Sequence, residues 1–192
     1  MQIEYEATFL DVEKDNIRQR LERVGAEQIY PEFMQKRIVF SMPKKPKLDD
    51  KWVRLRQEQD RITLSIKQVS GNKIEDQKES SFGVDDWDEA KQFVLELGCT
   101  EKSYQENKRE LWILDNVEIT IDEWPFLEPF VEVEGKSEKA VKQVSEKLSF
   151  DYTQARFCAI GLLYREKYNL PHGISNFTPK LVFDMKNPFI KQ

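Results

Sequence analysis

Several segments of the chain alternate apolar and polar residues with a period of two, which is the pattern of β-strands. In the N-terminal MQIEYEATF, apolar residues alternate with Glu4 and Glu6. The stretch WVRLRQEQDRITLSIKQV predicts two strands joined by a turn, with Arg54 and Arg56 on the polar side of the first and Lys67 on that of the second. Because side chains alternate between the two faces of a strand, each segment predicts one apolar face and one polar face.

Other segments carry the same strand signal. IYPEFMQKRIVFSM and KIEDQKESSFGV each predict a strand, and PFLEPFVEVEG predicts another, whose prolines limit its pairing. SYQENKRELWILDNVEITIDEW predicts a hairpin that turns at Asp115 and Asn116, because these residue types accept the backbone of a tight turn. The stretch PKKPKLDD predicts a loop.

Apolar residues at helical spacing mark the remaining segments. DVEKDNIRQRLERVGA predicts an amphipathic helix, and DDWDEAKQFVLELG predicts a second one, capped by Asp85 or Asp86 and stopped by Gly98. SEKAVKQVSEKLS predicts a third helix with Ser137 as its cap, and TQARFCAIGLLYREKYN predicts a further helix. Antiparallel strands flanked by helices define an α+β protein, here with a sheet that curls or closes.

The charged residues on these strands are segregated by sign. Glu4 and Glu6 share one face of their strand, Glu132 and Glu134 share one face of FVEVEG, and the arginines lie on a different strand. A sheet with one face in water explains any single pair by solubility alone. Two pairs of like charges nevertheless repel within their own strands, which favours a common ligand.

A divalent cation together with a polyanion explains this segregation. Carboxylates are hard oxygen donors suited to Mg²⁺ or Mn²⁺, while arginine and lysine bind phosphate oxygens. If the apolar faces pack against outer helices, the charged faces point at one another, and a closed barrel with a polar lumen follows. The residues expected to point inward are the acids Glu4, Glu6, Glu79, Asp122, Glu132 and Glu134 and the bases Arg54, Arg56, Lys67 and Arg109.

Composition narrows the class of protein. A chain of 192 residues fits one large domain by default, and its net charge of −5 predicts no general attraction to nucleic acid or to an anionic membrane. Cys99 and Cys158 are expected to be reduced thiols, and His172, the only histidine, leaves little basis for a zinc site or a histidine triad. The absence of a leader-like or membrane-spanning apolar run predicts a cytoplasmic protein, and its oligomeric state stays open, a homodimer included.

An ordered series of motifs resembles a known family. The series consists of E-x-E at the N-terminus, R-L-R, the T-L-S-I-K strand, an isolated arginine at Arg109, I-D at Asp122 and a late E-V-E. It resembles the CYTH family of triphosphate tunnel metalloenzymes, which includes class IV adenylyl cyclases, thiamine triphosphatases and inorganic triphosphatases. The resemblance covers residues 1–169 and implies an eight-stranded antiparallel β tunnel with helices outside, leaving 170–192 as an extension of unknown role.

The resemblance also implies roles for the inward residues. The metal ligands would be Glu4, Glu6, Asp122, Glu132 and Glu134, with Glu79 as a helper and Mg²⁺ or Mn²⁺ as the cofactor. The residues that bind the substrate phosphates would be Arg54, Arg56, Lys67 and Arg109. Among all of these, the catalytic group would be Glu4, Glu6, Lys67 and Arg109.

One position departs from the family pattern. The opening motif of the family is E-x-E-x-K, and this chain has Thr8 where the lysine belongs. Threonine donates a hydrogen bond but carries no positive charge. Lys36 or Arg37 on the next strand, and Lys167 or Arg165 near the end of the last helix, are the candidate replacements.

These observations favour a metal-dependent enzyme that acts on a nucleoside, thiamine or inorganic triphosphate. Hydrolysis is slightly favoured over the alternative reaction, cyclisation of ATP to cyclic AMP and pyrophosphate, because hydrolysis demands fewer contacts. The loss of the lysine at Thr8 motivates another alternative, a module that binds nucleotide or polyphosphate without turnover. The remaining alternative is a structural domain whose charge alternation serves only solubility.

Overall fold

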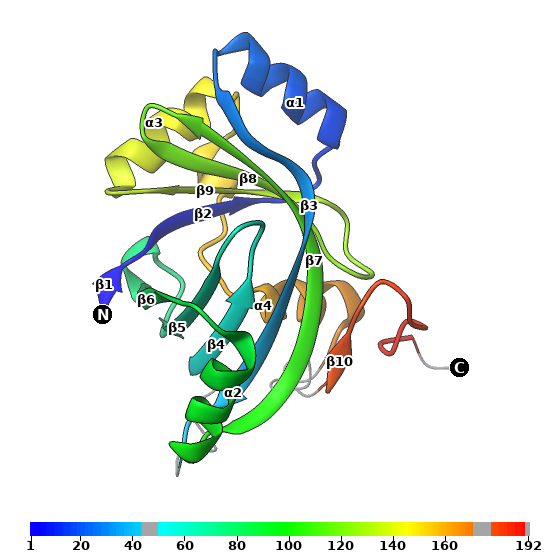
Figure 1. Ribbon diagram of the computed structural model, residues 1–192. Helices are drawn as coiled ribbons and strands as arrows, with labels where there is room; N and C mark the ends of the chain where they lie inside the picture. Colours follow the sequence, from blue (N-terminus) through cyan, green and yellow to red (C-terminus); the bar gives the residue numbers. More distant parts are fainter. Residues whose placement is uncertain (44–49, 171–177, 191–192) are drawn as a thin grey trace.

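The structure, a computed structural model, describes residues 1–43, 50–170 and 178–190. Its main feature is one antiparallel sheet that curls into a barrel, with the helices outside (Figure 1). Along the sheet the strand order is β1-β6-β5-β4-β3-β7-β8-β9-β2, and β10 pairs with β7. The bounds of the strands are β1 Gln2–Ile3, β2 Tyr5–Phe9, β3 Glu27–Ser41, β4 Lys51–Gln57, β5 Ile62–Val69, β6 Gln77–Val84, β7 Thr100–Leu114, β8 Val117–Glu123, β9 Phe130–Gly135 and β10 Lys180–Leu181.

The N-terminal segment closes the barrel by changing partners at Glu4. β1 pairs with β6, the backbone N–H of Glu4 donates to Gln77 at 3.0 Å, and from Tyr5 onward the chain pairs with β9. β1 and β2 are therefore the two halves of one broken strand that joins the ends of the sheet. If this strand is counted once, β1/β2 and β3 to β9 make eight strands in the described chain, as the family resemblance implies, and β10 is a short parallel addition.

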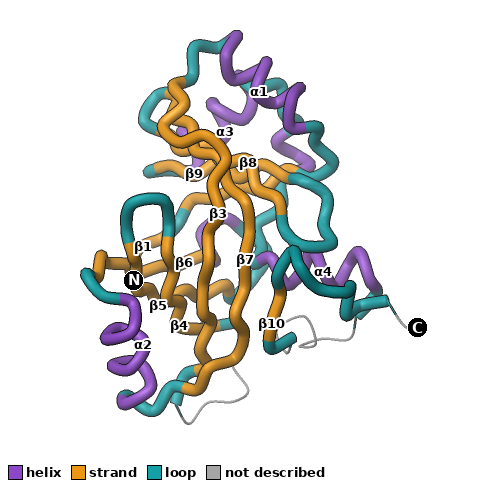
Figure 2. Tube along the Cα trace, turned by 45° about the vertical axis from the view of Figure 1, so that its right-hand side comes forward, coloured by secondary structure: helices purple, strands orange, loops and turns teal. Residues whose placement is uncertain are grey.

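Four helices lie around the barrel in the described chain, and three of them pack against its apolar outer face. Their bounds are α1 Lys14–Arg23, α2 Trp87–Glu96, α3 Glu138–Lys147 and α4 Ile160–Tyr168, with 3₁₀ turns at Ile74–Asp76 and Tyr152–Gln154. Leu21 of α1 and Val141 of α3 pack with the outward residues Ile119 and Val133, whereas Val94 of α2 packs in a separate cluster against β3, β4 and β5. Figure 2 shows α2 beside the lower part of the barrel, away from α1 and α3.

The local signals read from the sequence determine where the elements begin and end. The Asp86 carboxylate accepts from the Glu89 N–H at 2.8 Å at the start of α2, and the Ser137 hydroxyl oxygen accepts from the Ala140 N–H at 3.3 Å at the start of α3. Asp115 and Asn116 have φ values of 53° and 60°, as a tight hairpin turn requires. These predictions are confirmed.

The last predicted helix is shorter than its sequence pattern suggests. Residues Tyr152–Gln154 form a 3₁₀ turn, and α4 begins only at Ile160. Arg156 lies between them in extended backbone, because its N–H and C=O both bond to Thr8 at 2.9 Å. A long-range pairing thus overrides the local helical signal.

The described part of the tail packs on the barrel. β10 runs parallel to β7, and the Phe189 ring lies 5.0 Å from the Tyr164 ring and 5.2 Å from the Tyr168 ring of α4. The only regular element of the tail among the described residues is the two-residue strand Lys180–Leu181. His172 and most of the predicted loop PKKPKLDD lie outside the described residues. None of the described helices is both long enough and apolar enough to cross a membrane.

Candidate active site: a charged tunnel

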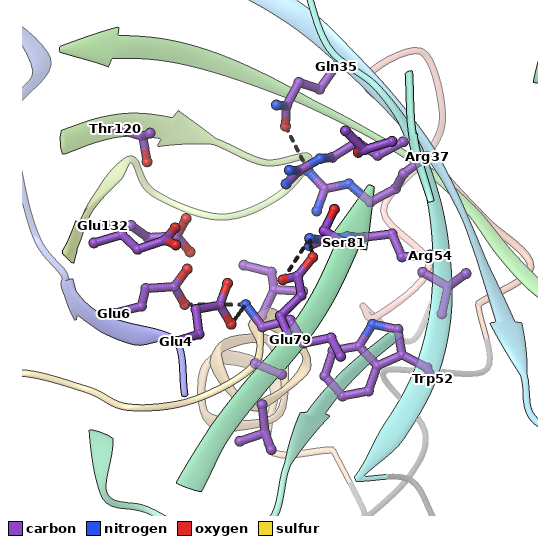
Figure 3. Close-up of a pocket in the computed structure, with 18 of the residues that line it drawn as sticks. Glu4, Glu6, Gln35, Arg37, Trp52, Arg54, Glu79, Ser81, Thr120 and Glu132 are labelled. Atoms are coloured by element: carbon purple, nitrogen blue, oxygen red, sulfur yellow. Dashed lines mark hydrogen bonds and ion pairs between the residues drawn. The ribbon is translucent and has the colours of Figure 1, made fainter. Parts of the chain in front are cut away.

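The barrel encloses a cavity of about 990 Å³ lined by charged and polar side chains together with apolar ones such as Trp52 and Leu111. Period-two alternation places these side chains on the inner faces of successive strands, such as Arg54 and Arg56 on β4 and Lys67 on β5. In Figure 3, Glu4, Glu6 and Glu132 on one side face Arg37 and Arg54 on the other. The lumen therefore has an acidic wall, formed by β2 and β9, and a basic wall, formed by β3, β4, β5 and β7.

The acidic wall carries a cluster of carboxylates. Glu4, Glu6 and Glu134 each offer an oxygen within 4.8 Å of the others. The register of the sheet brings them together, because Glu6 and Glu134 are direct cross-strand partners and Glu4 lies two residues before Glu6 on the same face. Glu132 is the cross-strand partner of Thr8, one step further along the wall.

Crowding makes these carboxylates hard to ionise together. Burial raises the pKa of Glu6 well above its ordinary value, and Glu132, Glu4 and Glu134 raise it further against the attraction of Lys67. Burial and repulsion from Glu4 raise the pKa of Glu134 to about 7. The Glu134 side chain stays accessible to solvent from the cavity, and solvent screens part of this repulsion.

The basic wall binds the acidic wall through ion pairs. The Lys67 ammonium lies 2.8 Å from Glu4 Oε2 and 3.5 Å from Glu6 Oε1. Burial alone would lower the pKa of Lys67, but Glu4 and Glu6 raise it above its ordinary value, so Lys67 carries its charge.

The arginines of the lumen have partners of their own. The Arg54 guanidinium donates to both oxygens of Glu79 at 2.9 and 3.1 Å, and Arg56 pairs with Glu58. The pKa of Glu79 is depressed, since Arg54 and Lys67 outweigh the effect of burial. Glu79 is thus engaged in holding Arg54.

The donors of the acidic wall fit a divalent cation. Glu4, Glu6 and Glu134 supply carboxylate oxygens alone, the ligand type that Mg²⁺ and Mn²⁺ prefer. Their mutual repulsion raises the free energy of the ion-free site, and a cation would relieve it.

Comparisons with known proteins agree with this arrangement. The family description "CYTH domain" matches residues 2–166. The chain belongs to the CYTH family. No curated protein matches the chain.

Solved structures with the same fold are distant in sequence. A candidate adenylate cyclase from Vibrio parahaemolyticus superposes with a TM-score of 0.73 at 11% identity, covering 84% of this chain and 97% of that one. A conserved hypothetical protein from Pyrococcus furiosus gives 0.66 at 19% identity, with 82% and 97% covered. A candidate adenylyl cyclase from Hippeastrum, described as having a dominant triphosphatase activity, gives 0.53 at 10% identity, with 92% and 100% covered.

The CYTH barrel places one expected metal ligand behind the lumen surface. Asp122 is fully buried and is not among the residues that line the cavity. Its oxygens accept from Arg109 at 2.8 and 2.9 Å, from Asn107 at 2.8 Å and from Thr120 at 2.7 Å. Asp122 therefore orients Arg109, whose guanidinium also reaches Glu132 at 2.6 Å.

The candidate replacements for the missing lysine are distributed between the inside and the outside of this CYTH domain. Arg37 and Arg165 line the cavity. The Lys36 ammonium lies 5.6 Å from the Trp87 ring of α2, on the outer face. Lys167 donates to Glu128 at 2.7 and 2.8 Å and is not among the lining residues, so the structure does not bring it into the lumen.

Sequence reasoning missed several residues that line the cavity. Glu118 and Thr120 precede Asp122 at period two on β8, and Glu58 follows Arg56 in the same way, so strict alternation would have found all three. Gln35 lines the cavity from β3 two residues before Arg37, so the same alternation would have found it.

The start of α4 also contributes to the lining, from Cys158 to Leu162. Cys99 and Cys158 are both unpaired thiols, and burial, with a contribution from Glu6, raises the pKa of Cys158 to about 12. Cys158 is therefore a neutral thiol and no thiolate ligand at ordinary pH.

Proposed function

We propose that the protein is a divalent-metal-dependent enzyme that hydrolyses a triphosphate. The observation that carries this proposal is the arrangement of the lumen, in which Glu4, Glu6 and Glu134 lie within 4.8 Å of one another opposite a wall of arginine and lysine. A triphosphate with its metal ion is a ligand that needs both walls at once. The CYTH domain match supports the same class of substrate.

Each wall has a distinct role in this reaction. Glu4, Glu6 and Glu134 would hold Mg²⁺ or Mn²⁺, with Glu132 beside them, and the bound ion would neutralise phosphate charge and increase the electrophilicity of phosphorus. Arg54, Arg56, Lys67 and Arg109 would bind the phosphate oxygens and stabilise the charge that develops on the leaving group. Water would attack the terminal phosphorus, and the bond from that phosphorus to the bridging oxygen would break. The diphosphate part of the substrate would leave, the water oxygen would remain in inorganic phosphate, and the proton lost by the water would pass to solvent.

Pre-organisation of these cations supports catalysis. Glu79 holds Arg54, and Asp122 holds Arg109 through two hydrogen bonds. Side chains fixed in this way need little reorganisation when charge moves in the transition state. Glu79 and Asp122 are positioning residues in this scheme.

Cyclisation of ATP is the second candidate, and the size of the cavity favours it. A volume of about 990 Å³ lies at the upper end of the range of roughly 300–1,000 Å³ for small-molecule sites, more than a bare triphosphate chain fills. Trp52 and Tyr30 line the cavity and offer aromatic surface to a base. Two solved structures of the same fold are described as candidate adenylate cyclases, which also supports cyclisation.

Product analysis tests the proposal. The purified protein is incubated with Mg²⁺ or Mn²⁺ and with tripolyphosphate, ATP or thiamine triphosphate in parallel. Release of phosphate supports hydrolysis, and cyclic AMP with pyrophosphate supports the cyclase. Tight binding of a triphosphate without any product would instead identify a binding module and overturn the enzymatic proposal.

A further inference from the structure

Arg37 differs from the other tunnel-lining arginines of the basic strands in its partners. Those on β4 and β7 each pair with a carboxylate, as described above. For Arg37, no carboxylate lies within ion-pair distance among the described residues. Its guanidinium instead donates to two neutral amide oxygens, that of Gln35 at 2.9 Å and that of Asn107. Arg37 is therefore a buried cation without an anionic partner.

The surroundings of Arg37 fix its orientation. The side chain is 6% exposed, and the guanidinium carbon lies 4.5 Å from the centre of the Trp124 ring. The aromatic ring covers one face of the guanidinium plane. The edge that carries Nε has no hydrogen-bond partner, although the residue lines the cavity.

A second arginine lies directly across from Arg37. Arg37 of β3 and Arg56 of β4 are cross-strand partners on the inner face, and the Nε atom of Arg56 is also buried without a hydrogen bond. Like charges at directly opposed positions destabilise a sheet. Burial and neighbouring arginines lower the pKa of Arg37 well below its ordinary value and lower that of Arg56 to about 10.

No positive charge reaches the lumen from the position of Thr8. Thr8 is 2% exposed and lies across from Glu132, and its backbone is bound to Arg156. The Arg156 guanidinium turns outward and pairs with Glu166 at 3.2 Å. The acidic wall consequently has no cation of its own at the place where the family carries lysine.

We propose that Arg37 and Arg56 form a clamp for one phosphate group of the substrate, and that Arg37 supplies from β3 the positive charge that Thr8 cannot supply from β2. A phosphate between the two guanidiniums would accept hydrogen bonds from both and remove their repulsion. Burial of the unpaired Arg37 charge costs free energy, and only a bound anion would offset this cost. Arg37 is in this sense a substrate-binding residue. The inference rests on the proposed function, since it requires a polyphosphate in the tunnel.

Calorimetric titration with an imido-bridged triphosphate, which resists hydrolysis, tests the clamp in the presence of Mg²⁺. The proteins compared are the wild type, Arg37→Gln, Arg37→Lys and the matched control Lys36→Gln on the outer face. We expect Arg37→Gln to weaken binding by about tenfold or more, Arg37→Lys to lose less because it keeps the charge, and Lys36→Gln to bind as the wild type does. The melting temperature of ligand-free Arg37→Gln should equal or exceed that of the wild type.

Two results would overturn the clamp. Equal affinity of Arg37→Gln and wild type would show that Arg37 does not touch the phosphates, while the proposed function would stand because the wild type binds. A marked fall in the ligand-free melting temperature of Arg37→Gln would make Arg37 a structural residue. A wild type that binds no triphosphate would remove the proposed function and the clamp together.

Discussion

The two walls of the tunnel differ in how far their charges are balanced by opposite charges. On the acidic wall, Glu6 and Glu134 face each other across a strand pair, and burial and repulsion raise the pKa of both carboxyls. On the basic wall, Arg54 has a carboxylate of its own in Glu79. One wall is crowded with like charge, and the other is largely paired.

This difference shows what each wall lacks. The acidic cluster needs a cation, because only neutralisation lets neighbouring carboxylates ionise together. On the strands of the basic wall, the described arginine without a carboxylate partner is Arg37, which donates to amide oxygens. Lys67, which contacts Glu4 and Glu6, couples the two walls and would respond to a ligand on either side.

The largest expected effect comes from breaking the acidic wall. Glu4→Gln removes one charge from the carboxylate cluster while it keeps the shape of the side chain, and we expect metal-dependent turnover to fall by more than about a hundredfold. Glu134→Gln should behave in the same way. Circular dichroism should show an unchanged fold in both variants.

The matched control for these variants is Glu101→Gln, which changes an outer carboxylate that pairs with Lys91. This control should retain wild-type turnover. If Glu4→Gln turned over substrate at the wild-type rate with Mg²⁺ saturating, the carboxylate cluster would not be the metal site.

A smaller effect is expected from the basic wall. Arg56→Ala removes one guanidinium from the phosphate side, and we expect KM for the triphosphate to rise by about ten- to a hundredfold. Steady-state kinetics at fixed Mg²⁺ measures the change. An unaltered KM would mean that Arg56 does not contact the substrate.

The pH dependence of stability sharpens the comparison further. Glu6 and Glu134 have raised pKa values, that of Glu134 about 7, so the folded protein holds protons that the unfolded chain has released between about pH 4.5 and 7. Metal-free stability should therefore fall as the pH rises through this window. Saturating Mg²⁺ should reduce the fall, because a bound cation stabilises the ionised carboxylates.

Thermal unfolding at pH 5, 6, 7 and 8, with and without Mg²⁺, measures this dependence. Glu79 and Glu58 have lowered pKa values, so their titration changes the stability only at pH values below this window. They therefore do not mask the effect of Glu6 and Glu134. Metal-free stability that rose steadily from pH 5 to pH 8 would contradict the crowding of the acidic wall.

The smallest effect is expected outside the tunnel. Lys167→Ala removes an ion pair with Glu128 on the outer surface, so KM should stay within about twofold and the free energy of unfolding within about 0.5–1 kcal/mol. Kinetics and urea denaturation measure the two quantities. A large rise in KM would bring Lys167 back as the replacement for the family lysine.

The sequence predicted the walls well because alternation is a local property. Once Glu4 and Glu6 are in a strand whose other face is apolar, both carboxylates must lie on the opposite face, and the same holds for Arg54 and Arg56. Closure of the sheet then directs these faces inward.

The sequence could not separate lumen residues from those one layer behind. Asp122 obeys the same alternation, but register places Arg109 directly across from it, and Arg109 and Asn107 take up its oxygens. Cross-strand register depends on pairing between distant segments, which period-two patterns do not encode. For the same reason, the pairing of Thr8 with Arg156, which shortens the last helix, left no local signal.

The broken N-terminal strand gives the barrel a seam, and the seam carries two of the clustered carboxylates. Glu4 lies where the chain passes from β6 to β9, and Glu6 follows within β2. The carboxylate cluster proposed as the metal site is thus assembled only when the two ends of the sheet have met. A metal ion bound there would stabilise the closed barrel. Amide hydrogen exchange should therefore slow together on both sides of the seam when the metal binds.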